Sequence, residues 1–80
     1  MIKLIIADDE RLIREGLKTI INWKSLGFEI VADARDGEEC LEKLNTLKPE
    51  VCIIDIRMPG KSGLEVIKEV RSMGLLQKSL

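Results

Sequence analysis

The chain has 80 residues, of which 45% are hydrophobic and 34% are charged, and its formal net charge at pH 7 is −1. This size holds one small domain over residues 1–80, and the balanced charge gives no basic surface for nucleic acid or a membrane. Because the sequence contains no histidine, Ser/His or Cys/His catalysis and histidine metal sites are excluded from this chain.

The first 21 residues predict a buried strand followed by a helix. Residues 4–7 are an apolar run that ends abruptly in Asp8 and Asp9, as expected for a parallel strand whose carboxyl end emerges from the core. The N-terminus shows no signal-peptide pattern and no membrane-spanning length, so we expect a cytoplasmic protein. Residues 10–21 then carry an apolar stripe along one helical face, made of Leu12, Ile13, Leu17, Ile20 and Ile21.

Two further strand–helix units follow. Residues 28–34 favour a strand, Asp36-Gly37 is a turn signal, and residues 38–47 repeat the helical stripe until Lys48-Pro49-Glu50 stops it. The third strand, residues 51–54, ends at Asp55, and a loop over residues 57–63 leads to a helix that we expect to end near Gly74. That helix places Leu64, Ile67 and Val70 on one side, with Val66 near the edge. Residues 75–80 are too weakly patterned to assign.

The two cysteines fall in a predicted helix (Cys40) and a predicted buried strand (Cys52). We therefore expect them to be small core residues rather than a disulfide or a metal-binding pair.

The β-α-β-α-β alternation predicts an α/β fold, a flavodoxin-like three-layer parallel sheet with right-handed crossovers and about three βα units. In the flavodoxin-like order the first strand lies between the second and the third. The carboxyl ends of the first and third strands then meet at the switch point. That geometry brings Asp8, Asp9 and Asp55 into one crevice.

Three clustered carboxylates repel one another unless a divalent cation neutralises them, and ligands that offer only oxygen suit magnesium. A metal-assisted phosphate site is therefore the first hypothesis. The alternative is that each acid only caps a helix, as Asp9-Glu10 would at a helix N-terminus. Capping needs only one short polar residue per helix, so two buried strands that both end in aspartate favour the functional site.

Three motifs, IIADDE at residues 5–10, DIRMP at residues 55–59 and the glycine Gly63, together resemble the receiver domain of two-component response regulators. Residues 21–31 and 36–39 further resemble receivers that precede an AraC-type DNA-binding domain. The resemblance covers residues 1–73 and implies a truncated receiver, without the fourth strand that ends in Thr or Ser and the fifth that ends in Lys. Four residues do not stand in those motif contexts and are expected at the surface: Ser72, Ser79, Lys61 and Lys78.

The resemblance also implies roles for the acidic residues. Asp55 would be the phosphoacceptor and form an aspartyl phosphate, Asp8 and Asp9 would be the acidic pair that holds Mg²⁺ together with Asp55, and the backbone carbonyl of Arg57 would be a further metal ligand. The phosphodonor would be a sensor histidine kinase or a small molecule. Such a chain is a regulatory phosphoacceptor rather than an enzyme.

A receiver without its last two strands should leave the third strand as an unpaired apolar edge and expose helix faces, so we expect a homo-oligomer. Two other functions remain open from the residues. One is a self-associating interaction module that no longer accepts phosphate. The other is an aspartyl-nucleophile hydrolase, which is disfavoured because Arg57 stands where an acid would normally follow the nucleophile.

Overall fold

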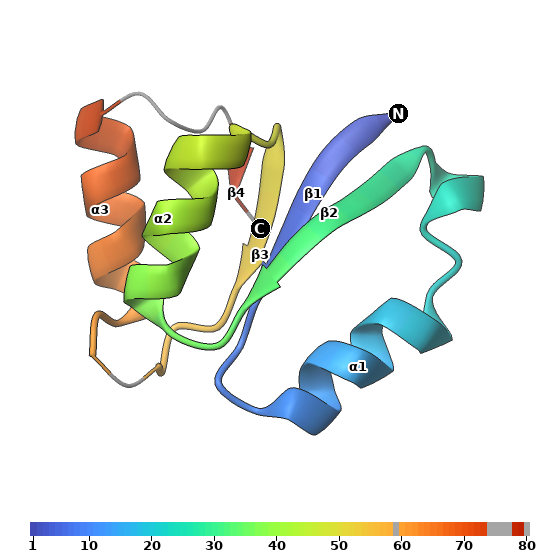
Figure 1. Ribbon diagram of the computed structural model, residues 1–80, viewed down its shortest axis with the longest axis horizontal. Helices are drawn as coiled ribbons and strands as arrows, with labels where there is room; N and C mark the ends of the chain where they lie inside the picture. Colours follow the sequence, from blue (N-terminus) through green and yellow to red (C-terminus); the bar gives the residue numbers. More distant parts are fainter. Residues whose placement is uncertain (59, 74–77, 80) are drawn as a thin grey trace.

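A parallel sheet lies between two helical layers in the computed structural model, which describes residues 1–58, 60–73 and 78–79 (Figure 1). The sheet has four parallel strands in the order β2-β1-β3-β4, which confirms the predicted flavodoxin-like arrangement. In chain order the elements are β1 (Ile2–Ala7), α1 (Arg11–Ile20), the 3₁₀ turn η1 (Lys24–Leu26), β2 (Phe28–Ala34), α2 (Gly37–Leu47), β3 (Val51–Ile54), α3 (Gly63–Met73) and β4 (Lys78–Ser79).

Strand β1 is central, and its alternating side chains divide the core in two. Ile5 and Ala7 belong to the cluster under α2 and α3, whereas Leu4 and Ile6 belong to the cluster on the α1 side. All four are at most 1% exposed. Figure 1 shows α2 and α3 side by side against one face and α1 against the other. Burial on both faces explains why this strand is a continuous apolar run.

The register of β1 fixes where the strands end. Ala7 pairs with Ile54 of β3 on one side and with Ala34 of β2 on the other. Pairing with β2 is interrupted by a register shift between Leu4 and Ile5, as in a β-bulge. The residues that follow Ala7 and Ile54 therefore emerge next to each other at the carboxyl edge of the sheet.

Helix α2 follows its sequence signals closely. Asp36, predicted as a turn residue, is the N-cap, and its Oδ1 accepts a hydrogen bond of 2.8 Å from the backbone N–H of Glu39. The helix ends at Lys48, which adopts a left-handed conformation with φ of 47°. Cys40 and Leu44 are buried in the core, as the predicted stripe requires.

Helix α1 does not bury the stripe that the sequence suggested. Leu12 and Ile20 are 86% and 84% exposed, and no residue of the helix is buried. Leu17 packs against the core, and the inward side of the helix also carries Arg14, whose side chain is 13% exposed. The helix turns this side inward because β2 presents the carboxylate of Asp33, with which Arg14 forms an ion pair.

Helix α3 is also rotated relative to the predicted stripe. Val66 and Val70 are 1% and 3% exposed, whereas Leu64 is 54% exposed. The first residue of the helix is Gly63, which packs directly on the backbone of Asp55. The buried face therefore runs through residues 63, 66 and 70. The predicted helix end at Gly74 lies outside the described residues.

The third strand is not the unpaired edge that the sequence suggested. Its first two residues, Val51 and Cys52, pair in parallel with Lys78 and Ser79 of β4. A short strand from the unassigned tail thus covers part of this edge. Within the described part of the chain, every helix falls short of the length and apolar character needed to cross a membrane.

Candidate functional site

Three aspartates meet at the carboxyl edge of the sheet, where the sequence predicted them. Asp8 and Asp9 follow β1 and Asp55 follows β3, and the backbone N–H of Asp55 donates 2.9 Å to the carbonyl oxygen of Ala7. Each of the three side chains offers one carboxylate oxygen, and these oxygens lie within 4.8 Å of one another. The strand order and register therefore deliver the acidic cluster directly.

Asp8 is held in place by the turn that leads into α1. The residue is only 9% exposed. Its backbone N–H donates 3.0 Å to the carbonyl oxygen of Ala34, and its Oδ1 accepts a bond of 2.9 Å from the N–H of Glu10. Glu10 is the N-cap residue of α1, but its side chain makes no capping hydrogen bond. Helix capping therefore does not account for this acidic run, because Asp8 instead closes the turn ahead of the helix.

The loop after β3 orients Asp55. Oδ1 of Asp55 accepts a hydrogen bond of 3.1 Å from the N–H of Arg57, and the N–H of Gly63 donates 2.9 Å to the carbonyl oxygen of Ile56. Met58 anchors the loop because its side chain, 7% exposed, belongs to the core cluster under α2 and α3. Pro59, which the sequence placed in the same loop, lies outside the described residues.

The cluster suits a small divalent cation that prefers oxygen. Mg²⁺ binds ligands at about 2.1 Å in octahedral geometry, so oxygens on opposite sides of the ion are about 4.2 Å apart. The 4.8 Å limit that contains all three carboxylate oxygens is slightly wider than that span. Small side-chain rotations would bring the oxygens to ligand distance. The donor set is oxygen alone, which suits a hard cation such as Mg²⁺ better than the softer metals that prefer nitrogen or sulfur ligands.

A cationic pair on α1 borders the cluster. Arg14 donates through Nε to Oδ2 of Asp33 at 3.0 Å, and Nζ of Lys18 lies 2.9 Å from the same oxygen. Burial alone would raise the pKa of Asp33, but the hydrogen bonds from Lys18 and then Arg14 outweigh it and hold that pKa below its ordinary value. The hydrogen bond to Asp33 raises the pKa of Lys18. Asp33 and Lys18 are therefore both charged at neutral pH.

Arg14 also reaches the site itself, because its Nη1 donates 2.8 Å to the carbonyl oxygen of Asp8. Sequence reasoning missed this contact and the ion pairs with Asp33. The available signal was Arg14 and Lys18 at i and i+4 on one helix, followed by an acid in the next strand. The sequence does not show which face of that helix turns inward.

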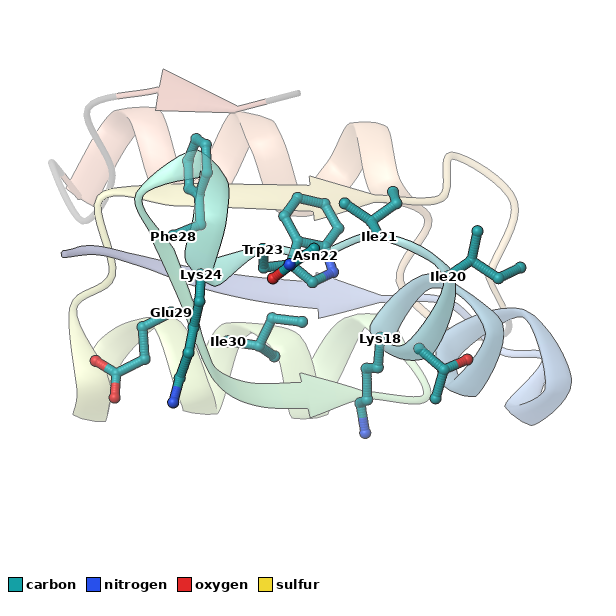
Figure 2. A pocket seen from close by; sticks show the side chains of 10 residues that line it. Lys18, Ile20, Ile21, Asn22, Trp23, Lys24, Phe28, Glu29 and Ile30 are labelled. Carbon is teal, nitrogen blue, oxygen red and sulfur yellow. The ribbon is translucent and has the colours of Figure 1, made fainter.

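A separate depression of about 650 Å³ lies between the end of α1, the following turn and β2 (Figure 2). Trp23 and Phe28 line it with their rings edge to face, 6.0 Å between centroids. The indole N–H of Trp23 donates to the carbonyl oxygen of Leu17. None of the three aspartates lines this depression, which is therefore distinct from the candidate site.

The cysteines are core residues, as predicted. Cys40 and Cys52 are free thiols, 0% and 1% exposed, with their sulfur atoms 4.0 Å apart. Neither belongs to the acidic cluster, whose members are all aspartates.

Comparisons with known proteins agree with this geometry. A family model described as the response regulator receiver domain matches residues 4–78. The uncharacterized transcriptional regulatory protein YesN of Bacillus subtilis is 44% identical over 73 residues. The REC domain of AraT, a response regulator from Geobacillus stearothermophilus, superposes with a TM-score of 0.82 at 43% identity. A two component transcriptional regulator AraC from Clostridium phytofermentans gives a TM-score of 0.84 at 34% identity.

These matches cover most of the present chain but only part of the other proteins. The aligned region is 91% of this chain and 20% of YesN. For the two solved structures it is 89% and 91% of this chain, and 55% and 57% of theirs. The chain thus spans a fifth of that curated relative and just over half of the two structural relatives.

Proposed function

The chain belongs to the response regulator receiver family, and from this premise we propose that Asp55 accepts a phosphoryl group at a site where Asp8, Asp9 and Asp55 hold Mg²⁺. The observation that carries the proposal is the convergence of three carboxylate oxygens within 4.8 Å at the carboxyl edge of β1 and β3. The backbone carbonyl of Arg57 is the further ligand in this proposal. Its support is the position of Arg57 beside Asp55, to which its N–H donates.

The proposed reaction is a phosphoryl transfer to a carboxylate. One oxygen of Asp55 forms a bond to phosphorus while the bond between phosphorus and the donor's leaving group breaks, and the leaving group departs with that electron pair. The hydrogen bond from Arg57 N–H to Oδ1 orients the carboxylate and leaves Oδ2 for the attack. Bound Mg²⁺ supplies the positive charge that lets an anionic donor approach three carboxylates.

We infer that the donor is a sensor histidine kinase or a small phosphodonor, and that the chain acts as a regulatory phosphoacceptor in the cytoplasm rather than as an enzyme that turns over a separate substrate. Membership of the receiver family supports this inference. The inference also agrees with the chemistry of the acidic cluster, which offers a nucleophilic carboxylate and oxygen ligands for a cation. A hydrolase is not favoured, because Arg57 follows the nucleophile where such enzymes place an acid.

The test is the intact mass of the protein after incubation with a small acyl phosphate, with and without Mg²⁺. We expect one phosphoryl group to be added only when Mg²⁺ is present, and none to be added to Asp55→Asn. Asp36→Asn is the matched control, since it makes the same chemical change at a helix cap, where asparagine substitutes well. It should be phosphorylated like the wild type.

Two results would contradict the proposal. One is a folded wild-type protein that gains no phosphoryl group at any Mg²⁺ concentration. The other is equal phosphorylation of wild type and Asp55→Asn, which would place the acceptor elsewhere. A circular dichroism spectrum of each sample establishes that it is folded.

Self-association is a second part of the proposal. Because β4 covers the start of β3, the exposed apolar side of α1 is the stronger candidate surface. Leu12 and Ile20 on that helix are both more than four-fifths exposed. Sedimentation velocity across a dilution series should show a dimer that dissociates in the double variant Leu12→Glu, Ile20→Glu. A wild-type monomer at every concentration would contradict it.

A further inference from the structure

A single guanidinium group ties together three elements beside the acidic cluster. Arg14 of α1 donates through Nη1 to the carbonyl oxygen of Asp8 at 2.8 Å and through Nε to Oδ2 of Asp33 in β2 at 3.0 Å. Its side chain is 13% exposed. The contact to Asp8 is made to the backbone immediately after β1, at the point where the chain turns toward α1.

We propose that Arg14 is a positioning residue for the magnesium site, acting through the backbone carbonyl of Asp8 to fix the orientation of Asp8 and Asp9. The inference rests on the proposed function, because it assigns Arg14 a role in the cation binding attributed to those two aspartates. Arg14 itself touches neither the cation position nor the phosphoacceptor in this proposal.

The geometry of the peptide bond explains how this works. The carbonyl of Asp8 and the N–H of Asp9 share one rigid plane, so a bond that holds the carbonyl also sets the direction in which Asp9 leaves the turn. The N–H and the Oδ1 of Asp8 are already held, by Ala34 and Glu10 respectively. Arg14 supplies the third restraint on Asp8. Among the described hydrogen bonds of Asp8, this is the only one whose partner atom belongs to another residue's side chain.

An arginine suits this role because its donors lie in a fixed planar fork, so one side chain can satisfy two acceptors in set directions. Lysine at the same position would keep the charge and the attraction to Asp33 but lose that directed pair. The chain also provides a matched control. Lys18 contacts the same carboxylate at 2.9 Å without a hydrogen bond to Asp8.

The experiment compares the Mg²⁺ dissociation constants of the wild type, Arg14→Lys and Lys18→Met by titration calorimetry. Removing groups that orient metal ligands typically weakens binding by roughly 10- to 100-fold. We expect Arg14→Lys to raise the dissociation constant about tenfold and Lys18→Met to leave it unchanged. Equal weakening in both variants would overturn the proposal, because it would assign the effect to the shared ion pair with Asp33.

A second readout does not depend on the metal. The amide resonance of Glu10 reports the turn that Asp8 closes, since this N–H donates to Oδ1 of Asp8. In Mg²⁺-free protein the resonance should shift in Arg14→Lys and stay in place in Lys18→Met, and an unchanged resonance in Arg14→Lys would contradict the proposal. If the wild type itself binds no Mg²⁺, the proposed function fails, while the Glu10 comparison still decides the role of Arg14.

A variant that fails to fold does not prevent the test. Asp33→Asn leaves Arg14 in place but removes the charged partner of its Nε group. We expect this variant to weaken Mg²⁺ binding severalfold and to shift the Glu10 amide in the same direction as Arg14→Lys. Unchanged binding together with an unchanged Glu10 amide would overturn the proposal.

Discussion

Gly63 lies against the backbone of Asp55 so closely that a Cβ atom at Gly63 would stand 2.3 Å from the Asp55 carbonyl oxygen and 2.8 Å from the Cα of Ile56. The neighbouring atoms are all backbone, and they belong to the segment that presents the phosphoacceptor. The contact is therefore a geometric requirement of the site as well as of the fold.

Replacing Gly63 with alanine should destabilise the protein by about 1–3 kcal/mol, because the added methyl group forces α3 away from the loop that carries Asp55. Urea denaturation measures the change. Gly16→Ala is the control, since Gly16 lies in α1 with only Ile20 Cδ1 nearby, at 3.9 Å. That change should stabilise the protein by roughly 0.5–1 kcal/mol. Equal effects of the two substitutions would contradict the close contact at Gly63.

The ion pairs of Asp33 predict a defined pH dependence of stability. Its pKa is lowered from 3.8, so the contribution of this carboxylate is present above that value and is lost as the pH falls through the lower pKa of the folded state. The pKa of Lys18 is raised from 10.5, so its contribution is present below that value and is lost as the pH rises through the higher folded pKa.

Asp33→Asn removes the carboxylate that Arg14 and Lys18 share, so both ion pairs are lost in one step. The variant should be less stable than the wild type at neutral pH, and the difference should shrink at both the acidic and the alkaline ends of the range. Thermal melts from pH 2 to 11 would show it. A difference in stability that stays constant across that range would mean that the ion pairs contribute nothing.

The buried thiols should be protected in the native protein. Contact with Cys40 and burial raise the pKa of Cys52, and the thiolate is the reactive form. We expect maleimide labelling of the folded chain to be slow and to proceed at the rate at which the structure opens, with both thiols labelled promptly in denaturant. Rapid labelling of either cysteine under native conditions would contradict the described core.

Mg²⁺ should stabilise the folded chain, because only the folded state brings the three carboxylates together. A ligand at 100 times its dissociation constant adds about 2.7 kcal/mol to the free energy of unfolding. The midpoint temperature of thermal unfolding should therefore rise with Mg²⁺ concentration in the wild type and in Asp36→Asn, but not in Asp9→Asn. A similar rise in Asp9→Asn would show that the cation binds somewhere else.

The sequence predicted the strand order and the acidic cluster because both depend on strong local signals. Residues 4–7 and 51–54 are apolar runs that end in acid, and the flavodoxin-like order then makes Asp8 and Asp55 neighbours. The turn at Asp36-Gly37 and the helix end near Lys48 were predicted for similar reasons, whereas the capping role of Asp36 was not. Such features can be predicted from the residues on the two sides of each strand or helix end, without knowledge of the rest of the fold.

The sequence did not predict which faces of α1 and α3 are buried, because that depends on the residues of other elements that each helix contacts. The apolar stripe of α1 suggested that Leu12 would be buried, but the helix turns Arg14 inward to meet Asp33. In α3 the close contact of Gly63 with Asp55 decides the face. The pairing of β4 with β3 was missed as well, because two paired residues leave no pattern that a sequence can show.

The central place of β1 also governs the order in which the chain can assemble during its synthesis. Both neighbours of β1 come later in the sequence, β2 at Phe28–Ala34 and β3 at Val51–Ile54, so β1 has neither sheet partner until those segments have been synthesised. Pairings between strands that are distant in sequence form slowly, because the entropy cost of closing the long loop comes before the stabilising contacts between the strands are made. A nascent chain that has not yet reached Asp55 therefore carries Asp8 and Asp9 without the third carboxylate, so the acidic cluster can form only after β3 has been synthesised.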